Sequence, residues 1–173
     1  MKRTVFTVCA MVLMAVSPAF AASAKIGFVD LQRALNQSEA GESAKVEISE
    51  EIQGYEGEVT RRQEELKNLK EDLEKKGALL SEEARAEKER EYEKKLKKFQ
   101  RFTKDIQDEL KQKDADFTRK IIDKIFRIVE EIGKKENYTV VLEKTESSLL
   151  YSDEKIDMTD KVIEVLDARE KSE

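Results

Sequence analysis

The stretch ISEEIQGYEGEVTRRQEELKNLKEDL, residues 48–73, carries the repeat that decides the fold. Its apolar side chains recur at steps of three and four residues, and Arg62 is the polar exception at a repeat position. A period of about 3.5 residues is typical of a helix that packs against another helix along a narrow seam. We therefore expect a long coiled-coil helix whose seam residues are Ile48, Ile52, Tyr55, Val59, Leu66, Leu69 and Leu73.

A second run with the same repeat follows after a short break. Gly77 ends the first run, and Ser81, followed by two Glu residues, supplies an N-cap and an acidic first turn. The sequence thus predicts an antiparallel helical hairpin, or arm, over residues 43–132 with its tip near residues 77–81. The seam of the returning helix is expected at Tyr92, Leu96, Phe99, Ile106, Leu110 and Phe117.

The base of the returning helix is more apolar than its upper part. Apolar residues fill most positions of residues 121–132, a face too wide for a two-helix seam. Another element must therefore cover this face. A short last helix, capped by Asp157 or Thr159, is expected to contribute, and its inward residues are Val162, Ile163 and Leu166.

Short strands are expected near both ends of the chain. Apolar residues alternate or cluster at Lys25–Asp30, Tyr138–Glu143 and Ser148–Tyr151. We expect these segments to meet in one small sheet, in a discontinuous β-rich body made of residues 23–42 and 133–173. The expected fold class is therefore mainly α with a small β body.

Three residues are expected to set local boundaries. The Asp30 carboxylate can cap a short helical turn that follows the first strand. Gly41 marks a break before the long helix, and Asn137 is suited to a left-handed stop after it.

The N-terminus has the features of a secretory leader over residues 1–22. Lys2 and Arg3 precede an apolar run, Val5–Val16, and a small-x-small cleavage pattern follows at residues 19–21. A membrane anchor is the alternative, but the run is shorter than the roughly 18 to 20 apolar residues needed to span a bilayer. Cleavage can follow Ala21, Ala22 or Ala24, and we expect an exported protein.

The composition excludes several kinds of chemistry. The 173 residues include 33 Lys or Arg and 38 Asp or Glu but no His and no Trp, and the single Cys lies in the expected leader. Imidazole and thiolate catalysis are therefore not expected in the mature chain. Carboxylate pairs such as Asp114 and Asp116 are expected on exposed helices without an apolar pocket. We predict that the protein is not an enzyme and needs no cofactor or metal.

The predicted body is too small to be stable alone. Three short strands and the helix bases bury little apolar surface, so we expect a homo-oligomer joined through the strand region. The residues predicted to make oligomer contacts are Ile26, Phe28, Val140, Leu142, Leu149 and Tyr151.

The order of these elements resembles the Skp/OmpH family of periplasmic chaperones over essentially the whole mature chain. The resemblance implies a trimer with a β-barrel body and three helical arms around a cavity. It also implies a periplasmic protein that holds unfolded outer-membrane proteins without ATP, and contact with anionic lipid or lipopolysaccharide. The segments that carry the resemblance are Lys25–Asp30, Tyr138–Leu142, Leu149–Tyr151 and Ile156–Ile163 with Leu166.

A basic segment on the returning helix is the main candidate for client binding. Residues 94–104 hold six cations, two Phe and no carboxylate. The cations can attract an acidic client while apolar side chains off the seam make weak contacts. The client-binding candidates are Leu79, Leu80, Lys94, Lys95, Lys97, Lys98, Arg101, Phe102 and Lys104.

This basic segment has two other interpretations. It can be a solvated coiled-coil face whose charge is offset by carboxylates such as Glu64 and Glu65 on the facing helix. A nucleic-acid partner is not expected, because the chain as a whole is acidic and has no recognition motif. The alternative function is a periplasmic adaptor that bridges folded partners, with the hairpin as a spacer.

Overall fold

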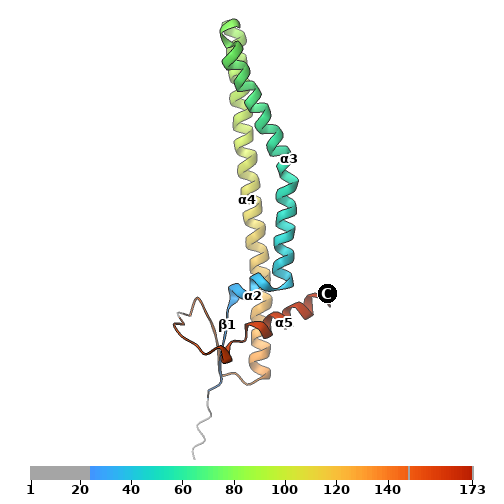
Figure 1. The fold of residues 1–173 in the computed structure, drawn as a ribbon, viewed down its shortest axis with the longest axis vertical. Helices are drawn as coiled ribbons and strands as arrows, with labels where there is room; N and C mark the ends of the chain where they lie inside the picture. Colours follow the sequence, from blue (N-terminus) through green and yellow to red (C-terminus); the bar gives the residue numbers. More distant parts are fainter. Residues whose placement is uncertain (1–23, 148, 173) are drawn as a thin grey trace, which may run out of the picture.

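The computed structural model describes residues 24–147 and 149–172. The expected leader, residues 1–22, lies outside the described residues. Figure 1 shows two long helices that run side by side and a small body at one end of them. The elements in chain order are β1 (Ile26–Val29), α2 (Leu31–Gln37), α3 (Glu39–Lys76), η1 (Gly77–Leu79), α4 (Glu82–Lys135), β2 (Val140–Glu143), η2 (Glu154–Ile156) and α5 (Thr159–Glu170).

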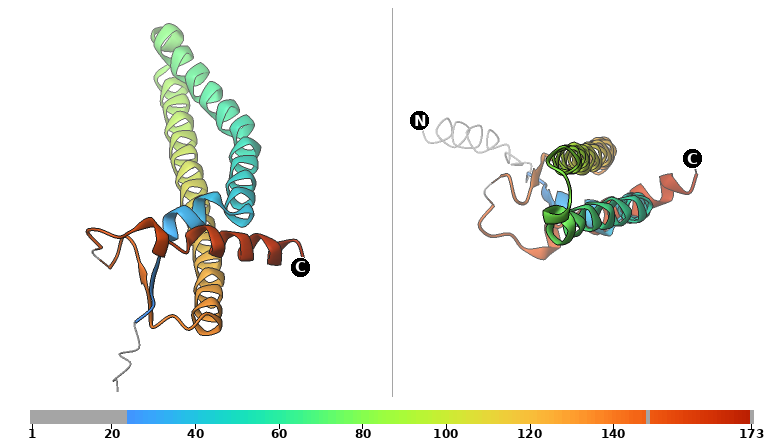
Figure 2. Two further views of the ribbon diagram at one scale, coloured as in Figure 1. Left: turned by 60° about the horizontal axis from the view of Figure 1, so that its bottom comes forward. Right: turned by 90° about the horizontal axis from the view of Figure 1, so that it is seen from above.

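The predicted helical hairpin is present. Helix α3 has 38 residues and α4 has 54, so at about 1.5 Å per residue they are about 57 Å and about 81 Å long. The Ser81 hydroxyl caps α4 as expected, because it accepts from the Ala84 amide at 3.3 Å. Near the middle of its length α3 bends away from α4 (Figures 1 and 2). The hairpin is therefore bowed on one side.

The corner between α2 and α3 forms near the expected residues. Asp30 caps α2, since its carboxylate accepts from the Arg33 amide at 2.8 Å. The break expected at Gly41 lies at Ser38, which is the N-cap of α3 and accepts from the Gly41 amide at 3.2 Å. At the other end, Asn137 adopts the expected left-handed conformation with φ of 58°.

A two-stranded parallel sheet joins the segment before the arm to the segment that follows it. Ile26 is paired with Val140 and Phe28 with Leu142. Because β1 precedes the whole arm and β2 follows it, the arm is an insertion between two paired strands. Figure 2 shows α5, which leads to the C-terminus, crossing α4 close to the start of α3, at the end of the arm that is far from the tip.

The third predicted strand, Ser148–Tyr151, is wrong for the described residues 149–151. They form no strand, and Leu150 and Tyr151 are 99% and 86% exposed. The reason lies in the sheet edges that the chain offers. The Met158 amide donates to the Phe28 carbonyl at 2.9 Å on β1, and a turn over residues 144–147 carries the chain away from β2. An extended segment without a partner strand stays in coil.

The core lies where the base of α4 meets β1, α2 and α5. The wide apolar face of α4 is covered except at Phe126, which is 54% exposed, and Ile125, Val162 and Leu166 are fully buried. The cap of α5 differs from both candidates, since Met158 holds the N-cap position. Asp157 still accepts from the Thr159 amide at 2.8 Å, and the buried Thr159 hydroxyl accepts from the Asp30 amide at 2.9 Å. This network fixes the start of α5 against the end of β1.

Candidate binding surfaces

A row of exposed cations follows one face of α4. Lys94, Lys97, Lys98, Arg101 and Lys104, here called the cationic stripe, recur at helical spacing and are all exposed. None of them forms an ion pair with a described residue. The seam residues between them, such as Leu96 and Phe99, are half-buried on the other face of the helix. Lys97, Arg101 and Lys104 therefore present positive charge away from α3, while Lys94 and Lys98 also border a groove between the two helices.

Two other predicted client-binding residues are engaged inside the hairpin. Lys95 is half-buried and pairs with Glu65 of α3, a hydrogen bond that raises the pKa of Lys95. Phe102 was predicted to lie off the seam, and that is wrong. Its ring packs edge-on against Tyr55 with the centroids 6.3 Å apart, and the Arg62 guanidinium lies 4.3 Å above it.

Polar contacts connect the lower half of the arm. The Lys113 ammonium lies 2.7 Å from the Glu51 carboxylate and 3.0 Å from that of Glu47, and these bonds raise the pKa of Lys113 to about 12. The Tyr55 hydroxyl donates to Glu109 at 3.1 Å. Ile52, a predicted seam residue, is exposed. In this region the two helices are therefore joined largely by charge and hydrogen bonds.

Two arginines of α3 that were not predicted from the sequence lie near the stripe. Arg61 and Arg62 both donate to the Glu58 carboxylate, at 2.7 Å and 2.6 Å, which lowers the pKa of Glu58 to about 2. They border a groove of about 440 Å³ between α3 and α4. We call it the hairpin groove, and its lining is Arg61, Arg62, Glu65, Leu66, Glu91, Lys94, Lys95, Lys98 and Phe99. The sequence did contain a sign of this site, because Arg62 is the polar exception at a repeat position and Arg61 precedes it.

The tip of the arm is apolar at one side chain. Leu79, in η1, is 87% exposed, whereas Leu80 is half-buried where the chain turns into α4. The predicted tip residues thus differ in what they offer to a partner.

The predicted oligomer contacts fall into two groups. Ile26, Val140 and Tyr151 are exposed, and Leu142 and Leu149 are half-buried. Phe28 is only 4% exposed in the single chain. Its side chain is thus largely buried within its own body, and its part in oligomer contacts stays a prediction.

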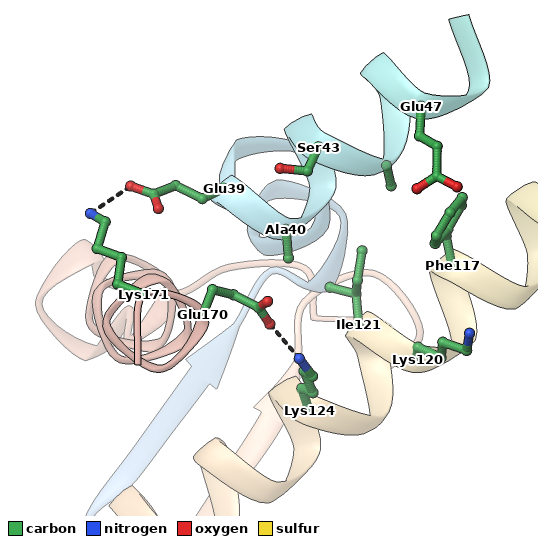
Figure 3. A pocket seen from close by; sticks show the side chains of 11 residues that line it. Glu39, Ala40, Ser43, Glu47, Phe117, Lys120, Ile121, Lys124, Glu170 and Lys171 are labelled. Atoms are coloured by element: carbon green, nitrogen blue, oxygen red, sulfur yellow. Dashed lines mark hydrogen bonds and ion pairs between the residues drawn. The ribbon is translucent and has the colours of Figure 1, made fainter. Parts of the chain in front are cut away.

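A second groove, not predicted from the sequence, lies at the base of the arm (Figure 3). It has a volume of about 460 Å³ and is bordered by α3, α4 and α5, with Ala40 and Ile121 on its apolar side. Lys171 pairs with Glu39 at 2.6 Å and Lys124 with Glu170 at 2.5 Å, which ties α5 to both arm helices. Its charged groups thus serve the docking of α5.

The described residues contain neither a metal-binding cluster nor a membrane-spanning helix. No group of three or more His, Cys, Asp or Glu side chains could hold a metal ion there. Among the helices of residues 24–147 and 149–172, none has the length and apolar character required to cross a membrane.

The fold and surface define a class of protein with a charged helical arm inserted into a small body. The model of the family described as outer membrane protein (OmpH-like) matches residues 25–166, and the chain belongs to this Skp/OmpH family. It is 31% identical to an uncharacterized Aquifex aeolicus protein over 80% of this chain and 83% of that one. It is 27% identical to a Skp-like protein of Pseudomonas aeruginosa over 83% and 84% of the two chains.

A solved structure has the same fold. It is a candidate outer membrane chaperone (OmpH-like) from Caulobacter crescentus, with a TM-score of 0.74 and 20% sequence identity over 86% of each chain. The predicted fold class, a long helical hairpin on a small β-containing body, is confirmed by this match and by the elements described above.

Proposed function

We propose that the protein is an ATP-independent holdase chaperone of the periplasm that binds unfolded outer-membrane proteins and prevents their aggregation. Membership in the OmpH-like family supports this role, as do the names of the Pseudomonas and Caulobacter proteins. Export by a cleaved leader, residues 1–22, is part of the proposal.

The cationic stripe is the observation that carries the proposal. Five exposed cations without ion pairs to described residues lie along a helix about 81 Å long. Long-range attraction to an acidic, unfolded chain needs no deep pocket. Contacts of this kind are individually weak, because exposed charge pairs contribute about 0.2 to 1 kcal/mol each. A client held by many such contacts can be released without nucleotide energy.

Oligomerisation through the body is the second part of the proposal. The exposed apolar residues Ile26, Val140, Leu150 and Tyr151 all belong to the sheet or to the coil that follows it. A homotrimer joined there would place three arms, residues 43–132, around a shared cavity. Leu142 and Leu149 would join this interface. The stripe would also contact anionic lipid or lipopolysaccharide.

The exposed tip supports a second candidate function. Leu79 is the large apolar side chain of the arm that is most exposed, at 87%. A periplasmic adaptor that bridges folded envelope proteins would use such a tip to bind one folded partner in a fixed ratio. A holdase would accept several unfolded proteins and would tolerate a change at Leu79.

The decisive test is the aggregation of a urea-unfolded outer-membrane barrel protein on dilution, followed by light scattering with and without the purified mature chain. We expect suppression that weakens as ionic strength rises, because salt screens exposed charges. A triple variant, Lys97→Gln, Arg101→Gln and Lys104→Gln, should suppress aggregation less well. The control triple is Lys111→Gln, Arg119→Gln and Lys120→Gln, which removes three exposed cations lower on the same helix.

The outcomes separate the two candidate functions. Full aggregation in the presence of a correctly folded oligomer would refute the holdase and favour the adaptor. Equal losses in the two triple variants would show that net charge, and not the cationic stripe, attracts the client.

A further inference from the structure

The hairpin groove combines an apolar floor with cations on both helices. Leu66 of α3 is buried and Phe99 of α4 is half-buried, and both line the groove. Arg61 and Arg62 lie on one wall, and Lys94 and Lys98 on the other. We propose that this groove is a specific subsite for an extended client segment in which an acidic side chain stands next to an apolar or aromatic one. The inference rests on the holdase function proposed above.

The cations of the groove differ in how far they are already neutralised. Arg61 and Arg62 share the Glu58 carboxylate, and Lys95 pairs with Glu65 and, at 3.8 Å, with Glu91. Lys94 and Lys98 are exposed and have no ion pair with a described residue. They are four residues apart on α4, so they lie on one face of the helix. An incoming anion would therefore be held by these two ammonium groups.

In this arrangement neither guanidinium is free of an ion pair, so Lys94 and Lys98 remain to bind an anion. Guanidinium groups bind phosphate in a bidentate manner, but Glu58 accepts from Arg61 through both of its oxygens, at 2.7 Å and 2.9 Å. The same carboxylate accepts from Arg62 at 2.6 Å. The groups that remain are ammonium point charges beside an apolar floor. A carboxylate with a neighbouring apolar side chain matches both parts.

The size of the groove limits what can enter it. About 440 Å³ lies in the range of roughly 300 to 1,000 Å³ that is usual for sites of small ligands and short segments. A folded domain would not fit between α3 and α4, whereas two or three residues of an extended chain would. The subsite thus adds local sequence preference to the general attraction of the cationic stripe.

The test is peptide binding to the full mature chain, measured by fluorescence anisotropy. Three labelled peptides of equal length in a Gly/Ser background would carry Phe-Asp, Phe-Asn or Ser-Asp pairs. We expect the Phe-Asp peptide to bind most tightly. The variant Lys94→Gln/Lys98→Gln should weaken its binding about five- to tenfold, and the control Lys111→Gln/Lys120→Gln less than about twofold. All four lysines are exposed and have no ion pairs with described residues, so the fold should tolerate both variants.

The results would separate this inference from the proposed function. Equal binding of the Phe-Asp and Phe-Asn peptides, or equal losses in both variants, would overturn the subsite. Loss of binding to vesicles containing anionic lipid in Lys94→Gln/Lys98→Gln, with peptide binding unchanged, would assign the groove to head groups and also overturn it. If the chain suppresses client aggregation while the peptides do not discriminate, the subsite fails and the holdase stands. If the chain does not suppress client aggregation, the holdase function is refuted, and the client subsite that rests on it is refuted with it.

Discussion

Gly41 lies in the first turn of α3, where the chain passes close to the end of α2. A Cβ atom added at this residue would lie 1.7 Å from the carbonyl oxygen of Leu35, which is backbone and cannot move aside alone. Gly54 is in the interior of the same helix, and a Cβ there would meet nothing within 4 Å. The two glycines therefore have opposite roles: Gly41 permits a close approach, and Gly54 only weakens a helix.

Replacing these glycines should change stability in opposite directions. Gly41→Ala should lower the free energy of unfolding by about 1–3 kcal/mol or more, because the α2–α3 corner must open to admit the methyl group. Gly54→Ala should raise it by about 0.5–1 kcal/mol through the higher helix propensity of Ala. Urea unfolding followed by circular dichroism, at one protein concentration, measures both. A harmless Gly41→Ala would contradict the described corner.

At the scale of single residues, the sequence predicted caps better than contacts. Ser81 and Asp30 act as caps because the hydrogen bond they form depends on only a few neighbouring residues. Phe102 was placed wrongly because its environment depends on side chains of the other helix, Tyr55 and Arg62, which pack against its ring. The repeat within one helix carries no information on which side chains of the other helix reach a given residue.

At the scale of the elements, ion pairs are frequent in the arm, within α3 and, at Glu65, between α3 and α4. Glu58, Glu65, Glu71 and Asp72 all accept hydrogen bonds from basic side chains, which lowers the pKa of each carboxyl group. A lowered pKa in the folded state stabilises the fold above the ordinary value of the group, and this contribution is lost as the pH falls through the lowered value. The arm should therefore be sensitive to acid.

The variant Glu58→Gln tests this sensitivity at one site. The pKa of Glu58 falls from 4.5 to about 2, so the thermal midpoint of the wild type should exceed that of the variant at neutral pH. The difference should shrink as the pH is lowered from 4.5 towards 2, where the wild-type carboxylate also becomes protonated. Thermal unfolding followed by circular dichroism across this pH range measures the difference in midpoint. Glu64→Gln, at an exposed residue without an ion pair to a described residue, is the control. A difference that stays constant with pH would argue against the ion-pair explanation.

The glycine pair in α3 has a consequence for the whole element. Gly54 and Gly57 lie in a helix that bends near its middle, and neither has a neighbour that a methyl group would meet. We expect Gly54→Ala/Gly57→Ala to stiffen the arm, because each Gly weakens the helix by about 1 kcal/mol relative to Ala. Small-angle scattering should show a narrower distribution of dimensions, and fewer clients should be held. Unchanged scattering and an unchanged client range would refute a hinge at this position.

At the scale of the whole molecule, the proposed oligomer depends on apolar residues of the body. Val140 is 40% exposed on β2, and a charge there cannot be buried against another copy without a large desolvation cost. Val140→Asp should therefore give monomers in sedimentation experiments. Val46→Asp, which places the same charge at an exposed valine of α3, should leave the mass unchanged. An unchanged mass for Val140→Asp would remove Val140 from the interface.

The overall architecture was largely predictable because helical periodicity and chain order determine it. The arm, its tip and the meeting of the two chain ends followed from the repeat in residues 48–73 and from the strand patterns at Lys25–Asp30 and Tyr138–Glu143. The strand expected at Ser148–Tyr151 is absent over the described residues 149–151 for a different reason. The apolar pattern of a segment shows that it suits a β-sheet, but a strand also needs the free edge of a neighbouring strand, which the pattern does not reveal. The hairpin groove was missed because it needs side chains from both helices at once.

The insertion of the arm between β1 and β2 imposes an order on folding. The Lys25 amide bonds to the Thr139 side chain across a sequence separation of 114 residues, whereas the arm is built from contacts between helices adjacent in the chain. Near neighbours in sequence meet first, and distant ones meet last. During synthesis, which starts at the N-terminus, β1 has no partner strand until the whole hairpin and β2 have been made. A truncated chain would therefore lack the closed body, and only full-length molecules would possess the surface through which copies are proposed to assemble.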